Sequence, residues 1–337
     1  MPNKGKTGVL LVNLGTPDAP TRSAVYRYLK QFLSDPRVID VWPVRNIVVP
    51  FIILPIRSGA SAKEYKKLWT EAGSPLKVYG YRLAEGVQAQ LGDEYMVELA
   101  MRYQSPSIES ALKKLMDQRV SRLIVLPLFP QYASASTGSV QEEVMKQLSK
   151  YWNMPDLKII ENFYDYQPMI DVFAERGLEH DMDAFDHILF SYHGLPERQI
   201  TKGDKCDHCF KEGCCDEISD RNQTCYKAHC AATTRAIAKK LNLSEDRYTI
   251  CFQSRLGRDP WVQPYTSDII EKLGKEGKKK ILAFCPAFIS DCLETTIEIS
   301  EEYQEVFEEF GGEKLQLVSS LNDHPKWIEA VADLVRG

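Results

Sequence analysis

Short runs of aliphatic and β-branched residues recur along the whole chain. Most of them are continuously apolar rather than alternating, which is typical of strands in a parallel sheet that is buried on both faces. Some stretches between the runs, such as Ser107–Gln118 and Thr233–Leu241, carry an apolar stripe at helical spacing. The predicted strands are Val9–Leu14, Tyr95–Met101, Leu123–Leu126, Leu157–Ile160, Ile188–Tyr192, Tyr248–Phe252, Ile281–Phe284 and Leu315–Val318.

The alternation of strands and helices predicts a doubly wound α/β fold. Because the strands fall on both sides of residue 150, we expect two similar lobes, 1–150 and 151–320, each a four-stranded parallel sheet flanked by helices. The last segment, 321–337, is expected to form a helix that packs back on the first lobe. A length of 337 residues fits two domains, since domains commonly have about 100–150 residues.

Polar, aromatic and turn residues directly follow six of the predicted strands. In open parallel sheets, ligands bind beyond the carboxyl ends of the strands. Gly, Pro and Ser at a single strand end commonly form only a loop, but six such ends together favour a binding cleft. The six segments are Asn13–Pro17, Arg102–Tyr103, Pro127–Ser139, Ser191–Gly194, Gln253–Arg255 and Pro286–Phe288.

Charge and hydropathy argue against two classes of protein, nucleic-acid binders and proteins with a membrane-spanning helix. Acidic residues outnumber basic ones by 47 to 42, and the net charge of −5 argues against a general nucleic-acid binder. No run of eighteen apolar residues occurs, so a membrane-spanning helix is not expected. Lys4 and Lys6 precede the apolar stretch Gly8–Val12, which is too short for a signal peptide and lacks a small-residue cleavage site. We therefore expect a cytoplasmic protein.

His193 directly follows an apolar strand, in the tetrapeptide Ser-Tyr-His-Gly. A lone histidine is more often a packed or surface residue, but its position at a strand end favours a functional role. A neutral imidazole accepts a proton near its usual pKa of about 6.5 and binds Fe²⁺ well. His193 is therefore a candidate proton acceptor or metal ligand.

The stretch Asp291–Phe310 holds eight carboxylates and no basic residue. Glu294, Glu298 and Glu302 have four-residue spacing, which on a helix aligns them as an acidic rail. A solvated acidic face is the commoner meaning of such a run. Function is favoured because Glu294 closely follows a strand end and because like charges four residues apart destabilise a helix. Such carboxylates are suited to passing on a divalent cation or protons.

Val48–Ile56 is almost entirely apolar and contains Pro50 and Pro55, which argue against a regular helix or a central strand. Burial in the core is the default interpretation. With Trp42 and Trp69 nearby, the alternative is an exposed apolar lip for a flat hydrophobic ligand or a membrane surface.

Six of the nine cysteines fall within 25 residues, and two histidines lie among them. In a reducing cytoplasm, this clustering indicates a metal site rather than disulfides. Four thiolates bind a [2Fe–2S] cluster or a structural Zn²⁺ ion. The spacing is not that of a regular zinc ribbon, so we favour the iron–sulfur cluster and keep zinc as the alternative. Four ligands are expected, with one of the adjacent pair spare, among Cys206, Cys209, Cys214, Cys215, Cys225 and Cys230.

Seven motifs stand in order along nearly the whole chain: LVNLGTP (Leu11–Pro17), GSPL (Gly73–Leu76), Arg102–Tyr103, PQYASASTGS (Pro130–Ser139), SYHGLP (Ser191–Pro196), QSRLGRDPW (Gln253–Trp261) and SDCLET (Ser290–Thr295). Together they closely resemble the ferrochelatase family, which catalyses the last step of haem synthesis. The resemblance implies two Rossmann-like lobes of the class II chelatase fold, with the porphyrin in the cleft between them.

The resemblance also implies roles for individual residues. His193 matches the histidine taken to bind metal or to accept pyrrole protons, and Glu294 matches the carboxylate that faces it. Glu298 and Glu302 match further acidic positions, and the segment at about 41–57 matches an apolar lip. Leu14 stands where relatives that use coproporphyrin have Tyr, which favours protoporphyrin IX. The positions that match macrocycle contacts are Leu14, Arg102, Tyr103, Tyr132, Trp261 and Phe288.

Two departures from the family concern the metal sites. Cys292 stands where animal members have a histidine two residues before the glutamate, so that histidine is not essential to the chemistry. Animal members take three cluster ligands from a C-terminal extension, whereas this sequence has no cysteine after Cys292. A cluster would therefore use the insert 203–230, which looks like an internal-cluster variant of some bacteria.

The resemblance thus implies a lyase that inserts Fe²⁺ into protoporphyrin IX and releases two protons. The net charge argues against nucleic acid as a partner. Peripheral membrane contact through the lip is a further expectation. Two alternatives stay open: a haem- or porphyrin-binding protein without turnover, and a cobalt chelatase of tetrapyrrole synthesis. Loss of free porphyrin on adding metal distinguishes the binding protein from the two enzymes.

Overall fold

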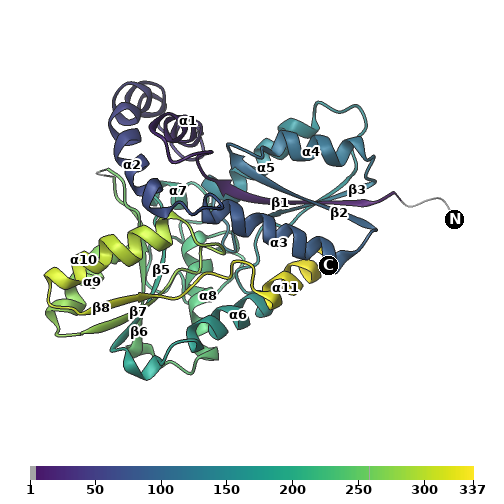
Figure 1. The fold of residues 1–337 in the computed structure, drawn as a ribbon. Coiled ribbons are helices and arrows are strands. Elements are labelled where there is room, and N and C mark those ends of the chain that lie inside the picture. The colour runs from purple at the N-terminus through teal and green to yellow at the C-terminus, as the bar shows by residue number, and fades with distance from the viewer. Residues whose placement is uncertain (1–4, 258) are drawn as a thin grey trace. The chain divides into compact units, whose positions relative to one another are not determined.

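The computed structural model describes residues 5–257 and 259–337, and it divides into two compact units. The first unit comprises the described residues up to Phe129, Ala133–Asn162 and Asp323–Gly337, and the second comprises Pro130–Tyr132 and Phe163–Asn322. Each unit holds one four-stranded parallel sheet (Figure 1), so the predicted α/β fold is confirmed. Arg258 of the QSRLGRDPW motif lies outside the described residues.

The sheet of the first unit has the strand order β2-β1-β3-β4. One face of the sheet packs on α4 and α5, through a core that includes Leu10, Leu112 and Val144. Ser107 caps α4 by accepting a hydrogen bond from the Ser110 N–H. The elements are β1 (Thr7–Gly15), α1 (Arg22–Leu33), η1 (Val44–Ile53), α2 (Leu54–Leu68), α3 (Pro75–Leu91), β2 (Tyr95–Tyr103), α4 (Ile108–Asp117), β3 (Arg122–Pro127), η2 (Ser134–Gly138), α5 (Ser139–Leu148), β4 (Asp156–Ile159) and α11 (Pro325–Arg336).

The sheet of the second unit has the strand order β6-β5-β7-β8, the same topology as the first. Its core joins β5, β6 and β7 to helices through Leu189, Ile270 and Phe307. All eight predicted strands are confirmed, each within two residues of its predicted ends. The elements are α6 (Gln167–Leu178), η3 (Met182–Ala184), β5 (His187–His193), α7 (Glu197–Thr201), α8 (Tyr226–Lys240), η4 (Glu245–Arg247), β6 (Tyr248–Gln253), α9 (Thr266–Lys275), β7 (Lys280–Phe284), η5 (Leu293–Glu302), α10 (Tyr303–Glu309) and β8 (Lys314–Leu317).

The last helix, α11, belongs to the first unit, together with α3. Ile328 of α11 fits so closely against Gly86 of α3 that a Cβ there would lie 2.6 Å from the isoleucine side chain. Arg336 adds a hydrogen bond from Nη2 to the Gln90 carbonyl oxygen. Apolar packing and this polar contact therefore attach the C-terminal segment to α3.

The apolar segment with two prolines forms helical structure, which the sequence did not predict. Val44–Ile53 is a π-helix, and Pro50 inside it contributes no N–H to its hydrogen bonds. Pro55 lies in the first turn of α2, a position where proline is common. Of the two interpretations of this segment, burial in the core is wrong and the exposed apolar lip agrees with the structure, because Phe51 is 76% and Ile56 is 70% exposed.

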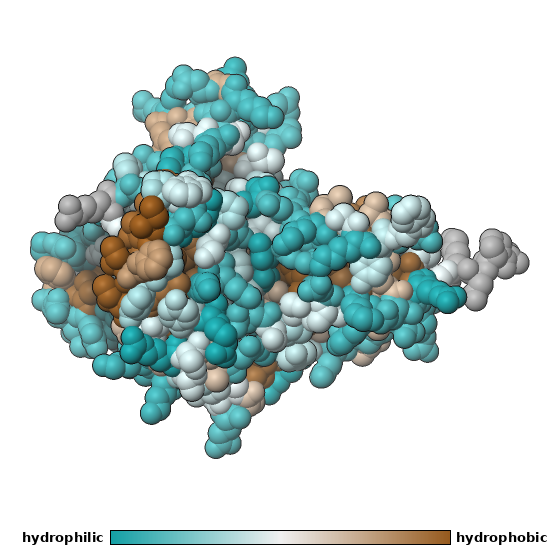
Figure 2. All heavy atoms as spheres, turned by 90° about the horizontal axis from the view of Figure 1, so that it is seen from above, coloured by the Kyte–Doolittle hydropathy of each residue, from teal (hydrophilic) through white to brown (hydrophobic). Residues whose placement is uncertain are grey.

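This exposed segment contributes to an apolar area on one face of the molecule. Trp42, Ile47, Phe51, Ile52 and Ile56 are all exposed, and they lie within or beside η1 and the start of α2. Figure 2 shows apolar side chains gathered on this face. Among the described residues, none of the helices combines the length and the hydropathy that crossing a bilayer requires.

Candidate functional site

His193 is the last residue of β5, and the sheet register pairs it with Gln253 at the end of β6. Its Nδ1 lies 2.6 Å from the carbonyl oxygen of Gly194. Because a carbonyl oxygen only accepts hydrogen bonds, Nδ1 carries the proton and the lone pair of the neutral ring is on Nε2. His193 is partly exposed, so Nε2 is able to accept a proton or to bind a metal ion.

Two aromatic side chains lie beside His193. Its ring centroid is 6.5 Å from that of Trp261 and 6.3 Å from that of Phe288. Gly194 makes this arrangement possible, because a Cβ at that position would lie 2.7 Å from the Gln253 carbonyl oxygen and 3.0 Å from the Trp261 ring. The His-Gly pair therefore places an imidazole against aromatic rings that suit a flat ligand.

Gln253 links the strand next to His193 with the acidic helix η5. Its Nε2 donates to the Glu294 carbonyl oxygen at 2.7 Å and to the Glu298 carboxylate at 3.1 Å. Its Oε1 accepts a hydrogen bond from the Ser191 hydroxyl at 2.7 Å. Gln253 is 1% exposed, so these bonds are shielded from water. The amide therefore fixes the start of η5 at the carboxyl ends of β5 and β6.

The carboxylates of the predicted rail have unequal surroundings. Glu298 accepts hydrogen bonds from the Ser254 N–H at 2.8 Å, the Ser254 hydroxyl at 2.6 Å, Gln253 at 3.1 Å and the Tyr303 hydroxyl at 3.1 Å. Burial and the nearby Glu298 raise the pKa of Tyr303, which stays a hydrogen-bond donor. Ser254 has a φ of 63°, in the left-handed region. Its two hydrogen bonds to Glu298 help to stabilise this conformation.

The other two carboxylates lie near the two ends of η5. Glu294, in the first turn of η5, is partly exposed, and the buried Cys292 thiol donates to it. Burial and Glu294 raise the pKa of Cys292, so this thiol remains protonated. Glu302 is exposed at the end of η5. The helix that carries the three glutamates is a π-helix with i→i+5 hydrogen bonds, a form common at functional sites.

Tyr132 also belongs to the second unit, as part of the short segment Pro130–Tyr132. Its main-chain N–H donates to Nδ1 of His229 on α8 at 3.2 Å. The preceding residue, Gln131, is buried and donates to the hydroxyl oxygen of Thr233 on the same helix at 3.1 Å. The second unit therefore carries Tyr132, Trp261, Phe288, His193 and the acidic residues.

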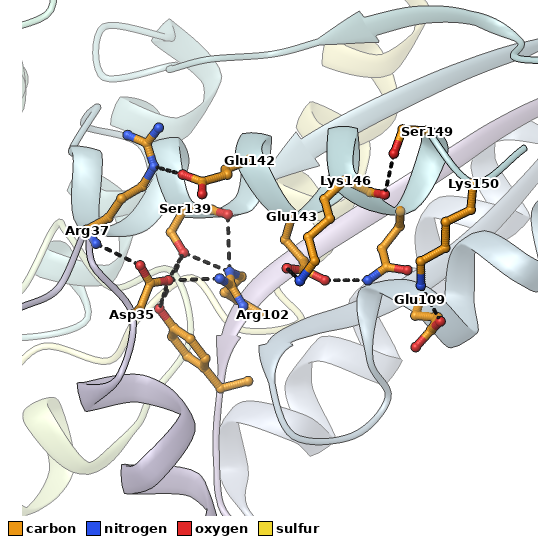
Figure 3. A network of polar contacts seen from close by, with 12 residues as sticks. Asp35, Arg37, Arg102, Glu109, Ser139, Glu142, Glu143, Lys146, Ser149 and Lys150 are labelled. Atoms are coloured by element: carbon orange, nitrogen blue, oxygen red, sulfur yellow. Dashed lines mark hydrogen bonds and ion pairs between the residues drawn. The ribbon is translucent and has the colours of Figure 1, made fainter. Parts of the chain in front are cut away.

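Leu14, Arg102 and Tyr103 lie at strand ends in the first unit. Arg102 donates through Nη2 to Asp35 at 2.8 Å and through Nε to the Ser139 hydroxyl at 2.7 Å (Figure 3). Tyr103 is only 2% exposed, and its hydroxyl donates to the same Asp35 oxygen at 2.8 Å. Burial and Asp35 raise the pKa of Tyr103. Tyr103 and Arg102 therefore share one Asp35 oxygen as their acceptor. Leu14, near the end of β1, is partly exposed.

Sulfur atoms of the cysteine-rich insert lie close together before and at the start of α8. Cys225, the N-cap of α8, accepts hydrogen bonds from Cys215 and Cys209, and the Cys214 and Cys215 sulfurs are 3.6 Å apart. The bond from Cys215, with the main-chain N–H groups at the helix start, lowers the pKa of Cys225 to about 6. Thiolate character at Cys225 suits a soft metal.

The other two cysteines of the insert have different surroundings. The Cys206 thiol is exposed and contacts Asp204 and the Arg221 carbonyl oxygen. Cys230 is completely buried in α8. Across residues 5–257 and 259–337, no three His, Cys, Asp or Glu side chains are arranged to hold a single metal ion. Thiolates are the usual protein ligands of iron–sulfur clusters.

Comparison with known proteins identifies the family. The ferrochelatase family model matches residues 6–337. A ferrochelatase of Coxiella burnetii (strain CbuK_Q154) is 48% identical over 338 residues, which cover 99% of this chain and 94% of the relative. A ferrochelatase of Legionella pneumophila (strain Lens) is 45% identical, with 98% of each chain covered. The chain belongs to the ferrochelatase family.

Solved structures support the fold of this ferrochelatase-family chain. SirB from Bacillus subtilis with Fe³⁺ has a TM-score of 0.53 at 14% identity, covering 98% of this chain and 94% of SirB. The sirohydrochlorin chelatase SirB in complex with cobalt has a TM-score of 0.55 at 12% identity, with the same coverage. At such low sequence identity, these similarities show only that the chain has the class II chelatase fold.

Three supporting residues of this ferrochelatase-family chain carry no assigned role in the sequence analysis. Gln253 stands in a quoted motif, but its two partners on η5 are more than 40 positions away. Asp35 accepts a hydrogen bond from Arg102, 67 positions away, and His229 accepts one from Tyr132, 97 positions away. The available signals were the strand-end position of Gln253 and the place of His229 among the clustered cysteines, because sequence spacing does not identify long-range hydrogen-bond partners.

Proposed function

We propose that this chain inserts Fe²⁺ into protoporphyrin IX to give protohaem, with release of two protons, and that His193 accepts a pyrrole proton. The tautomer of His193 carries this proposal, because a proton fixed on Nδ1 by Gly194 leaves the Nε2 lone pair available. Imidazole pKa values near neutrality suit a proton acceptor of this kind.

Metal insertion requires the porphyrin ring to be distorted. The two ring protons and the in-plane lone pairs block entry of Fe²⁺ until the ring buckles, and tight binding of remote parts can supply that strain. We assign the binding of the macrocycle faces to Leu14, Tyr132, Trp261 and Phe288. Arg102 uses Nε and Nη2 on Ser139 and Asp35, and we assign its Nη1 to a propionate.

We assign different roles to the three glutamates. Glu294 lies at the start of η5 and is partly exposed, which suits a carboxylate that receives iron or protons at His193. Glu298 already accepts four hydrogen bonds, which suits a residue that holds the Ser254 turn. Glu302 is exposed and suits an outer position on the iron path.

We further propose a [2Fe–2S] cluster bound by Cys209, Cys214, Cys215 and Cys225. This set includes both members of the adjacent pair, one of which was expected from the sequence to be spare. The mutual contacts of these sulfurs support that choice over Cys206 and Cys230. Inserting Fe²⁺ needs no electron transfer, so the cluster would stabilise the insert. A visible spectrum that bleaches with dithionite supports this, and a colourless protein with stoichiometric zinc contradicts it.

The exposed apolar segment around η1 supports a peripheral contact with membranes as a second proposal. Co-flotation with neutral phosphatidylcholine vesicles tests it, since the segment offers apolar area rather than charge. Binding that is lost in Phe51→Ser supports the proposal, and binding unchanged by that substitution contradicts it.

A fluorescence assay tests the reaction itself. Protoporphyrin IX and the purified protein are mixed without oxygen, and Fe²⁺ or Zn²⁺ is then added. Catalytic loss of free-porphyrin fluorescence supports the proposal. Porphyrin binding without such loss would identify a binding protein, and turnover of sirohydrochlorin with cobalt instead would identify the rival chelatase.

A further inference from the structure

His229 lies in α8, one turn after Cys225, and its side chain is completely buried. Its two ring nitrogens have opposite roles. Nδ1 lies 3.2 Å from the Tyr132 main-chain nitrogen, which can only donate, and Nε2 lies 2.7 Å from the Gln223 carbonyl oxygen, which can only accept. The ring is therefore neutral, with its proton on Nε2. Burial lowers the pKa of His229 to about 4, which agrees with a neutral ring.

Neighbouring contacts keep the His229 ring and its partner in place. The ring stacks on Tyr164 with centroids 3.9 Å apart and an interplanar angle of 12°. One turn further along α8, Thr233 donates to the Tyr164 carbonyl oxygen at 2.8 Å and accepts from Gln131. Gln131 and Tyr132 are thus attached to two successive turns of α8. A side chain so confined has few alternative positions for its hydrogen bonds.

His229 also connects two parts of the second unit that are far apart in sequence. Gln223 lies two residues before Cys225, at the end of the cysteine-rich insert. Tyr132 lies more than 90 residues earlier, at the end of the β3 loop. A single imidazole therefore bridges the insert and a residue assigned to the macrocycle.

We propose that His229 is a positioning residue for porphyrin binding, whose ring fixes the main chain at Tyr132 and joins it to the insert at Gln223. The inference rests on the proposed function in one respect, since Tyr132 is there assigned to the macrocycle. His229 is buried and acts through Tyr132 rather than on the substrate. Its loss should affect porphyrin affinity more than the chemical step.

Two substitutions separate the two hydrogen bonds of the ring. His229→Asn places an amide oxygen near the position of Nδ1, so it keeps an acceptor for the Tyr132 N–H and loses the donor to Gln223. His229→Gln reaches the position of Nε2, so it keeps the donor to Gln223 and loses the acceptor. Both variants lose the stacking on Tyr164, which makes them a matched pair.

Hydrogen–deuterium exchange and porphyrin titration give the readouts. In His229→Gln, we expect amide exchange in the peptide 130–136 to be about tenfold faster, with the porphyrin Kd and KM raised about tenfold and kcat within about threefold. In His229→Asn, we expect exchange, Kd and KM within about threefold of wild type. Equal effects of both variants, or a fall in kcat at unchanged KM, would overturn the inference.

Further outcomes keep the inference testable. If His229→Gln does not fold, His229→Asn decides alone: porphyrin Kd and peptide exchange within about threefold of wild type support the inference, and a tenfold change overturns it. Exchange and titration need no turnover. A wild-type protein that binds protoporphyrin IX without inserting iron would refute the proposed function and leave this test intact.

Discussion

The hydroxyl of Tyr226 lies 2.9 Å from the main-chain carbonyl oxygen of His193 and donates a hydrogen bond to it. Tyr226 is the first residue of α8 and directly follows Cys225. The same helix holds Tyr132 through His229. One helix that begins at the cysteine-rich insert therefore supports two residues of the proposed site.

Tyr226→Phe should slow metal insertion about fivefold while leaving porphyrin affinity unchanged, because an unpaired carbonyl loosens the turn after His193. Initial rates and a porphyrin titration measure the two quantities. Tyr192→Phe is the matched control, since it removes a buried hydroxyl that links β5 to Thr234 of α8 at 2.8 Å. Equal slowing in both variants would mean that weaker attachment of α8 to β5 causes the slower insertion, and that the bond to the His193 carbonyl has no separate effect.

Glu298→Gln should lower the free energy of unfolding by about 2 kcal/mol, because its amide group would face the Ser254 donors. Glu302→Gln, on an exposed side chain of the same helix, should change it by about 0.5 kcal/mol or less. Urea denaturation of both variants measures the difference. A Glu298→Gln protein of unchanged stability with a raised KM for iron would instead favour a relay role for Glu298.

Gly194→Ala should destabilise the fold by about 2 kcal/mol and reduce activity, because the new Cβ would lie 2.7 Å from a main-chain oxygen. Gly203→Ala provides the control, since its Cβ would meet nothing closer than 3.4 Å. Thermal unfolding and initial rates compare the two. Similar stability in both variants would show that the His193 turn adapts to a side chain.

Stability should also depend on pH through His187, which bonds to the Thr249 hydroxyl at 2.9 Å. Burial, with the nearby Lys278 and Arg247, lowers the pKa of His187 in the folded state. As pH falls below about 6.5, the unfolded chain takes up the proton first, so stability present above that pH is lost. His187→Gln should make this decline shallower in denaturation curves between pH 7 and 5. An unchanged decline would contradict the assignment.

The fold was predictable from the sequence because parallel strands buried on both faces appear as continuous apolar runs. Val9–Leu14 and Ile188–Tyr192 show this plainly, and both form central strands. For the apolar segment around Pro50, hydrophobicity alone suggested burial, and the resemblance to the family was needed to expect an exposed lip; Phe51 is mostly exposed. Hydropathy does not distinguish core from an exposed interaction surface.

The site was predictable in part. Position after a strand identified His193, and four-residue spacing identified Glu294 and Glu298 as one acidic row. Their different surroundings were not predictable, because three of the four hydrogen bonds to Glu298 come from Gln253 at the end of β6 and from Ser254 after it, 44 or 45 positions away. Tyr226 gave no signal at all, since its partner is a main-chain atom, which no sequence pattern marks.

The rate of iron insertion by His193→Ala tests the central claim most directly. The fluorescence of free protoporphyrin IX is followed after Fe²⁺ is added without oxygen, with porphyrin binding measured on the same sample and His187→Gln as a second histidine variant of β5. We predict porphyrin binding within about threefold of wild type and insertion at least about a hundredfold slower. Insertion at the wild-type rate by His193→Ala would contradict the account.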